Sequence, residues 1–134
     1  MQMKKYFLLI GIFFYSSQAM AEWEKVFLHD DTTVYLDFSF AQSTGTTATI
    51  RELRDCSKEQ SYMGSMYGYT FQSSAMETEY QCQTRQMRHL NAYWFAGNMG
   101  QGKKNFSKNR PGDWINFDGD EIAKRIFTIV CPKN

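Results

Sequence analysis

The apolar and polar positions between residues 23 and 96 predict several β-strands separated by turns and one loop. Residues 23–29 (WEKVFLH) and 32–38 (TTVYLDF) are rich in β-branched and aromatic side chains, which favour strands. Asp30 and Asp31 between them indicate a turn. We therefore expect the domain to begin with a β-hairpin.

A third strand is predicted over residues 46–55 (TTATIRELRD), after a second turn at residues 42–45. Residues 57–68 have only a weak pattern and predict a loop. We expect the buried side of the third strand to carry three apolar residues: Ala48, Ile50 and Leu53.

The next part of the chain predicts a second hairpin, with strands in residues 69–81 and 84–96 and a turn near Cys82. Residues 97–111 are polar and glycine-rich, so they predict a long loop. A short last strand is expected over residues 114–117.

Helical periodicity is clear only after residue 117. Asp118 can cap a helix, and Glu121 stands three residues later, as in a capping box. Ile122, Ile126 and Ile129 recur at helical spacing. Their stripe is widened by Ala123, Phe127 and Val130. The predicted fold class is α+β: an antiparallel β-sheet of about five to six strands with one C-terminal amphipathic helix packed on it.

The first residues have the three-part layout of a secretory signal peptide. Two lysines precede the apolar run of residues 6–15, and small residues follow at positions 19–21. The run is shorter than the roughly 20 apolar residues that a membrane-spanning helix needs. We therefore expect residues 1–21 to be a cleaved signal and residues 22–134 to form one exported domain without a membrane span.

Removal of this segment changes the charge balance. The whole chain has 15 basic and 14 acidic residues; without Lys4 and Lys5 there are 13 and 14, a net charge of −1. The mature domain would have 134 − 21 = 113 residues. A chain with no basic excess has no electrostatic footprint for nucleic acid, so we expect no nucleic-acid partner. No cysteine follows the cleavage position, so we expect a non-lipidated protein.

Three cysteines, Cys56, Cys82 and Cys131, remain in the mature domain. Exported proteins meet an oxidising environment, so the simplest outcome is one disulfide and one unpaired thiol. A zinc site would need Cys or His ligands at short spacing, and neither His29 nor His89 is so placed. We therefore expect no metal ion.

Residues 97–104 (GNMGQGKK) nearly match a phosphate-binding loop. However, Lys104 stands where a Ser or Thr should bind the metal, and residues 105–109 (NFSKN) do not begin a helix with an apolar stripe. A flexible glycine-rich connection between strands is the better interpretation. We expect no bound cofactor.

Candidate catalytic chemistry is equally weak. Asp118, Asp120 and Glu121 are too few and too close for a calcium loop, and helix capping explains them. No G-x-S-x-G motif is present. A pair of Cys56 with either histidine is conceivable, but no spacing fixes it, and both histidines are interpreted as strand surface. We predict no catalytic residue and no enzyme.

Several segments together resemble the surface-adhesin protein E family along most of the mature chain. Each motif alone is short, but their order and spacing are characteristic. The matching motifs are AEW at 21–23, TVYLD at 33–37, LRD at 53–55, EYQC at 79–82, GNMGQG at 97–102 and IVC at 129–131.

The resemblance implies an antiparallel sheet with a C-terminal helix, and a disulfide between Cys82 and Cys131. These cysteines are expected at a strand turn and at a helix end, so their bridge would fasten the helix to the sheet. Cys56 then remains unpaired, at a position where the family pattern does not require cysteine.

The resemblance also implies an exported, adhesin-like binding protein, at the cell surface or in the periplasm, that recognises a host extracellular-matrix or serum protein. The alternative is a periplasmic structural or accessory protein that shares the fold without adhesion, since fold alone does not determine activity. A small secreted enzyme is the third hypothesis, and the sequence offers no candidate catalytic residues for it. The sequence sets no oligomeric state.

Overall fold

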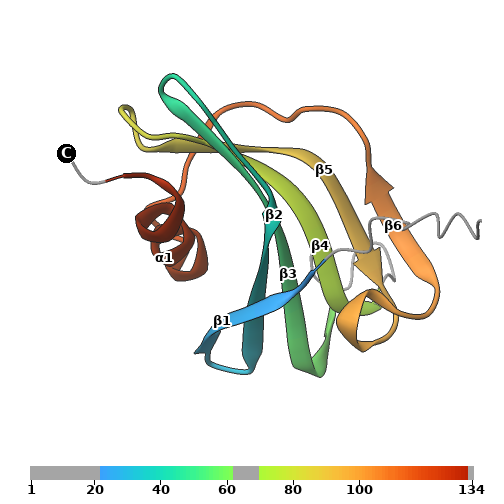
Figure 1. Ribbon diagram of the computed structural model, residues 1–134. Helices are drawn as coiled ribbons and strands as arrows, with labels where there is room; N and C mark the ends of the chain where they lie inside the picture. The colour runs from blue at the N-terminus through green and yellow to red at the C-terminus, as the bar shows by residue number, and fades with distance from the viewer. Residues whose placement is uncertain (1–21, 62–69, 133–134) are drawn as a thin grey trace, which may run out of the picture.

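One antiparallel β-sheet with a helix on one face makes up the described part of the chain (Figure 1). This computed structural model describes residues 22–61 and 70–132, so the signal peptide expected over residues 1–21 lies outside it. The elements are β1 (Glu24–His29), β2 (Thr32–Thr44), β3 (Thr47–Ser61), β4 (Thr70–Gln81), β5 (Gln86–Phe95), the short 3₁₀ turn η2 (Asn98–Gly100), β6 (Lys104–Lys108), β7 (Ile115–Asn116) and α1 (Glu121–Val130).

The strands follow one another in the order β1-β2-β3-β4-β5-β6, and β7 pairs with the beginning of β5. Every pairing is antiparallel. The predicted α+β class, with an antiparallel sheet and one C-terminal helix, is therefore confirmed, with seven strands in the described residues rather than five to six.

The additional strand, β6, lies in the segment that was expected to be a loop. It is short and forms an edge of the sheet, where Phe106 is the register partner of Trp94 and their rings lie 5.2 Å apart. An edge strand needs a partner on one side only, so five residues in a glycine-rich segment suffice. Local composition does not reveal such pairing, because the partner strand supplies it.

Strands β2 and β3 are both longer than expected. β2 continues to Thr44, through an irregularity between Asp37 and Gln42, and the turn follows at Gly45, which has φ +59°. β3 continues through residues 57–61, which were expected to belong to a loop, because its end pairs with the start of β4. The rest of that expected loop, residues 62–68, lies outside the described residues.

The main core lies between α1 and one face of the sheet, which we call the helix-side face. From the sheet it contains Val34, Leu36, Ala48, Ile50, Tyr80 and Met87, and from the C-terminal segment Phe117, Ile122, Ala123 and Ile126. Leu53 was expected to share a face with Ala48 and Ile50. It is fully buried, but on the other face of the sheet. It points to the opposite face, which we call the outer face, where Gly100 and Phe95 lie beside it.

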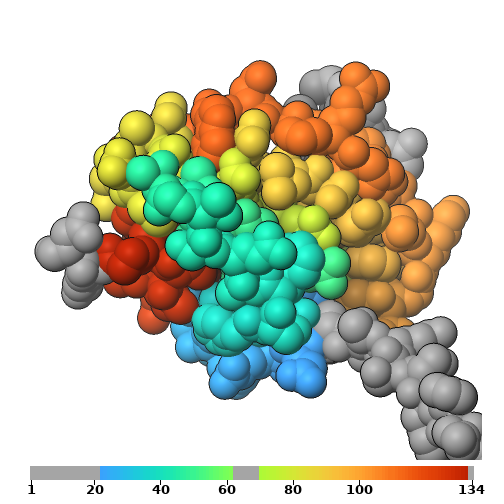
Figure 2. All heavy atoms as spheres, turned by 45° about the horizontal axis from the view of Figure 1, so that its top comes forward, coloured from blue at the N-terminus to red at the C-terminus, as the bar shows by residue number. Residues whose placement is uncertain are grey.

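The helix begins two residues later than the sequence suggests. Asp120, not Asp118, is the N-cap, and its Oδ1 accepts a hydrogen bond of 3.1 Å from the Ala123 amide. The last turn also differs, because Ile129 is 45% exposed rather than buried. It borders a shallow hollow beside the tip of the β2–β3 hairpin, which lies next to the red helix in Figure 2.

Both ends of α1 are tied to the sheet. At its C-terminus, a disulfide joins Cys131 to Cys82 in the turn after β4, with a Cα–Cα distance of 5.6 Å. At its N-terminus, Asp120 pairs with Arg54 of β3. The helix therefore covers the half of the helix-side face nearest the β4–β5 turn, and the other half carries the features described next.

Candidate functional site

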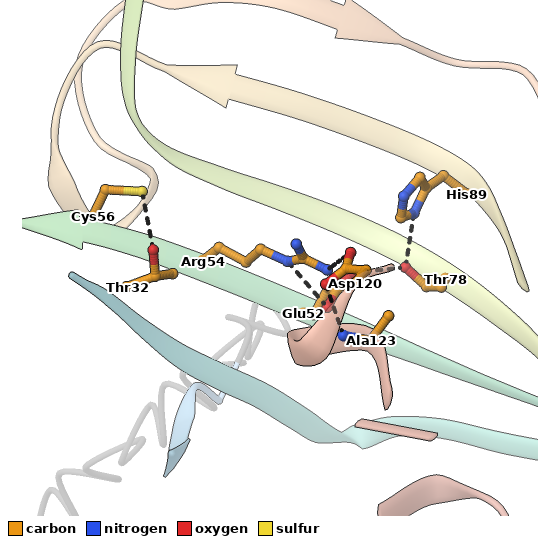
Figure 3. A network of polar contacts seen from close by, with 8 residues as sticks. All are labelled: Thr32, Glu52, Arg54, Cys56, Thr78, His89, Asp120 and Ala123. Carbon is orange, nitrogen blue, oxygen red and sulfur yellow. Dashed lines mark hydrogen bonds and ion pairs between the residues drawn. The ribbon is translucent and has the colours of Figure 1, made fainter. Parts of the chain in front are cut away.

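A cluster of polar side chains lies on the helix-side face beside the start of α1 (Figure 3). We call it the polar cluster; it consists of Glu52 and Arg54 from β3, Thr78 from β4, His89 from β5 and Asp120 from the helix N-cap. Successive residues of a strand point to opposite faces, so positions 52 and 54 continue the row that Ala48 and Ile50 begin. The strand therefore changes from apolar to charged along one face.

Arg54 lies between two carboxyl groups. Its Nη2 donates to Asp120 Oδ2 at 3.3 Å, and its Nε lies 3.7 Å from Glu52 Oε2. The Glu52 side chain has no exposed surface, and that of Arg54 is 18% exposed. Burial acts to lower the pKa of Arg54, but the charges of Glu52 and Asp120 act the other way and the pKa is raised. The guanidinium thus compensates the charge that Glu52 brings into the interior.

A hydrogen-bond chain continues from Glu52 to His89. Thr78 Oγ1 donates to Glu52 Oε1 at 3.0 Å, and the same oxygen lies 3.0 Å from His89 Nδ1. A hydroxyl has one proton to donate, so Thr78 must accept from His89 and the proton of His89 sits on Nδ1. Nε2 of His89 is then free to accept a hydrogen bond. Burial lowers the pKa of His89, which favours this neutral form.

The lowered pKa of His89 predicts a loss of stability in mild acid. Below about pH 6.5, a histidine in the unfolded chain binds a proton that folded His89 resists, so protonation favours the unfolded state. We expect the free energy of unfolding to fall between pH 7.5 and 5.5, and to fall less in the His89→Gln variant. Urea denaturation at both pH values measures this, and equal losses in the two proteins would contradict it.

Three buried polar atoms in this region have no hydrogen-bond partner among the described residues: Glu52 Oε2, Arg54 Nε and Tyr80 Oη. Burial, and next the charge of Glu52, raise the pKa of Tyr80 well above its ordinary value, so its phenol keeps its proton. Buried polar groups are normally paired, so unused bonding capacity here calls for an explanation.

An open surface hollow of about 330 Å³, which we call the cavity, adjoins the polar cluster on the uncovered half of the helix-side face. Arg54, Ser74 and Trp94 line it and are register neighbours across β3, β4 and β5. His89 and Cys56 also line it. The sequence analysis did not predict that these five side chains meet.

The unpaired Cys56 is buried, and its Sγ lies 3.8 Å from Thr32 Oγ1. Burial raises the pKa of its thiol, which lowers the fraction of nucleophilic thiolate. Cys56 and His89 line the same cavity, but no hydrogen bond joins them. This arrangement does not activate a nucleophile.

The outer face carries paired charges across neighbouring strands. Arg51 Nη2 and Glu77 Oε1 lie 3.0 Å apart, and Asn91 donates to the other oxygen of Glu77 at 3.0 Å. Arg88 and Glu79 form a second pair at 3.0 Å. Opposite charges side by side on adjacent strands stabilise the sheet and restrain the long side chains.

Aromatic rings border these charges. The guanidinium of Arg51 stacks over Phe40 at 4.0 Å, and the ammonium of Lys104 over Tyr93 at 4.4 Å. A hollow of about 240 Å³ lies between Trp23 and Tyr93, with Arg51 and Glu77 in its lining. Trp, Tyr and Arg are the residue types that most often dominate the energy of protein–protein contacts.

The glycine-rich loop does not form a phosphate site. Its amides are already used: Met99 N donates to Asp55 Oδ1 at 2.8 Å, and Gly100 N to Ser73 Oγ at 2.9 Å. The segment leads into β6 rather than into a helix. The interpretation as a connection between strands is therefore correct.

The described part of the chain shows neither a metal-binding cluster nor a membrane-spanning helix. No three His, Cys, Asp or Glu side chains within residues 22–61 and 70–132 are grouped so that they could hold a metal ion. The same part of the chain has no helix long and apolar enough to cross a membrane. His29 lies apart from the polar cluster, 3.5 Å from Asp30. His89 was expected on the strand surface; it lies on β5 and lines the cavity, but it is only partly exposed and bonds to Thr78.

Comparison with known protein families gives a match along most of the chain. No curated protein matches the chain in a sequence search. The family profile described as surface-adhesin protein E matches residues 23–132, which span nearly all of the residues that the structure describes. The antiparallel sheet, the C-terminal helix and the bridge between Cys82 and Cys131 are the features that the motif resemblance implied. The chain belongs to the surface-adhesin protein E family.

Proposed function

We propose that this protein is an exported surface adhesin that binds a host extracellular-matrix or serum protein through the outer face of its sheet. The observation that carries the proposal is the hollow between Trp23 and Tyr93, with Arg51 in its lining, on the face that α1 does not cover. Family membership supports an adhesin role. Residues 1–21 supply the signal peptide in this proposal, and residues 22–134 the non-lipidated mature domain.

The outer face has the chemistry of a protein-binding surface. An indole and a phenol ring provide apolar area with little conformational entropy to lose. Arg51 is held by Glu77 on one side and by the ring of Phe40 on another. Side chains that are already ordered lose less entropy when a partner binds, so more of the contact energy appears as affinity.

Binding through this face predicts two sensitive positions. We expect Trp23→Ala and Tyr93→Ala each to weaken binding to the recognised host protein by about 30-fold or more, since residues at the centre of an interface contribute about 2 kcal/mol or more. Surface plasmon resonance over a panel of immobilised matrix and serum proteins measures this. Ile129→Ala is the matched control, because Ile129 is exposed on α1, on the other side of the sheet.

The control should bind like the unmodified domain. If both aromatic variants retain their fold by circular dichroism and also bind unchanged, the outer face is not the binding surface. Protease shaving of intact cells tests the location independently. Cleavage before the envelope is opened supports the adhesin; cleavage only afterwards excludes adhesion and favours a periplasmic accessory protein.

A further inference from the structure

The cavity beside the polar cluster contains an unused hydroxyl. Ser74 is 4% exposed and lines the cavity, and its side chain makes no hydrogen bond with the described residues. Its register neighbours, Arg54 on β3 and Trp94 on β5, line the same cavity. Ser74 Oγ is not among the fully buried atoms without a partner, so it is reachable from the cavity. A group that enters the cavity can therefore form a hydrogen bond with it in place of water.

Two further groups on the cavity wall have unused bonding capacity. The guanidinium of Arg54 has five N–H groups, and its one hydrogen bond goes to Asp120. His89 uses Nδ1 with Thr78, which leaves Nε2 as an acceptor. The wall therefore offers donors, an acceptor and, at Ser74, a hydroxyl that can do both.

The charges nearby favour an uncharged ligand. The charge of Arg54 is already compensated by Glu52 at 3.7 Å and by Asp120 at 3.3 Å. An anion would approach both of these carboxyl groups as well as the guanidinium, and a cation would approach the guanidinium itself. Neither an anionic nor a cationic ligand would gain enough attraction to offset the hydration that it loses on binding.

Size and lining restrict the ligand further. A volume of about 330 Å³ is at the lower end of the usual 300–1,000 Å³ for small-molecule sites, which suits one ring rather than an extended chain. Phe71, Met76 and Trp94 add apolar surface to the polar groups. A sugar ring has apolar C–H faces and hydroxyls that both donate and accept around its edge, so it matches both kinds of lining.

We propose that this cavity binds an uncharged pyranose sugar, through hydrogen bonds to Arg54, Ser74 and His89 and apolar contact with Met76 and Trp94. The site lies on the opposite face from the proposed protein-binding hollow. It is therefore a second binding activity, which does not depend on the first.

The test titrates the mature domain with glucose, galactose, mannose and N-acetylglucosamine, observed by ¹H–¹⁵N NMR. We expect at least one of them to shift the amide signals of β3, β4 and β5 around the cavity. Glucuronate and glucosamine, which carry a negative and a positive charge, should bind more weakly. Failure of all four neutral sugars, or tighter binding of either charged one, would overturn the proposal.

Variants locate the site. We expect Ser74→Ala to weaken sugar binding by about tenfold, the upper range for one hydrogen bond. Ser43→Ala at the tip of the β2–β3 hairpin is the matched control, and it should bind like the unmodified domain, as should Trp23→Ala on the outer face. Equal affinity of the Ser74 variant and the control would refute the assigned site.

A second measurement needs no substitution. Cys56 lines the cavity and is the unpaired thiol, so a bound sugar should slow its modification by iodoacetamide in the native domain. An unchanged rate at a saturating sugar concentration would place the sugar elsewhere and overturn the proposal. Because host-protein binding is measured separately on Trp23 and Tyr93 variants, either proposal can fail while the other stands.

Discussion

Replacement of both Cys82 and Cys131 by serine is expected to lower the free energy of unfolding by up to about 4 kcal/mol. The two cysteines are 49 positions apart, and cross-linking a loop of that length removes about this much chain entropy from the unfolded state. Small domains have only about 5–15 kcal/mol of stability in total. The bridge therefore accounts for a large part of what keeps the domain folded.

Urea denaturation of the double variant against the unmodified domain measures this loss. The double replacement is necessary, because a single serine would leave a thiol that can pair with Cys56. Cys56→Ala is the control: it keeps the bridge and loses only a small buried side chain, so a loss of about 1 kcal/mol is expected. If the double variant is no less stable than this control, the bridge does not hold α1 on the sheet in the way proposed.

Much of the fold could be predicted because its signals are local. Alternation in residues 23–38 and 70–96 reflects strands with one buried face, and helical spacing after residue 120 reflects a helix with one buried stripe. The position of the helix start could not be found in this way. Asp118 and Asp120 are equally good caps by type, and Arg54, which is 66 positions from Asp120, decides between them.

The missed strand segments have a different cause. Residues 57–61 and β6 are held by pairing with β4 and β5, so their conformation depends on partners far away in the sequence. Leu53 shows a third kind of error. It is out of phase with Ala48 and Ile50, and the glycine loop, rather than the helix, buries it. Sequence alternation shows which residues share a face, but not what will cover the other face.

Part of the polar cluster could have been predicted from the sequence by following that alternation further along β3. Ala48, Ile50, Glu52 and Arg54 are all in phase, so two charged residues continue a buried row. Two charged residues in a row of positions that faces the core are candidates for a buried polar network. His89 could not be predicted in this way, because an irregularity between Glu77 and Thr78 shifts the register of β4 against β5.

Arg54→Met is expected to lower the free energy of unfolding by about 3 kcal/mol or more, the second large effect. Methionine keeps much of the side-chain volume, but it leaves the fully buried Glu52 without a compensating charge. Removing one member of a buried ion pair typically costs about 3–5 kcal/mol, mostly because the other charge remains buried. Asp120 also loses the partner that holds the helix N-terminus on β3.

A double-mutant cycle separates the uncompensated charge from the loss of packing. If the buried charge of Glu52 is the cause, adding Glu52→Gln to Arg54→Met should recover part of the lost stability, because position 52 then carries no buried charge. Arg51→Met is the matched control on the outer face of the same strand. Its side chain is 38% exposed and pairs with Glu77, so the expected cost is about 1 kcal/mol or less. Urea denaturation of Arg54→Met, Glu52→Gln, the double variant and Arg51→Met measures the differences. Equal losses for Arg54→Met and Arg51→Met would show that solvent reaches Glu52, and the polar cluster would then not be the buried network described above.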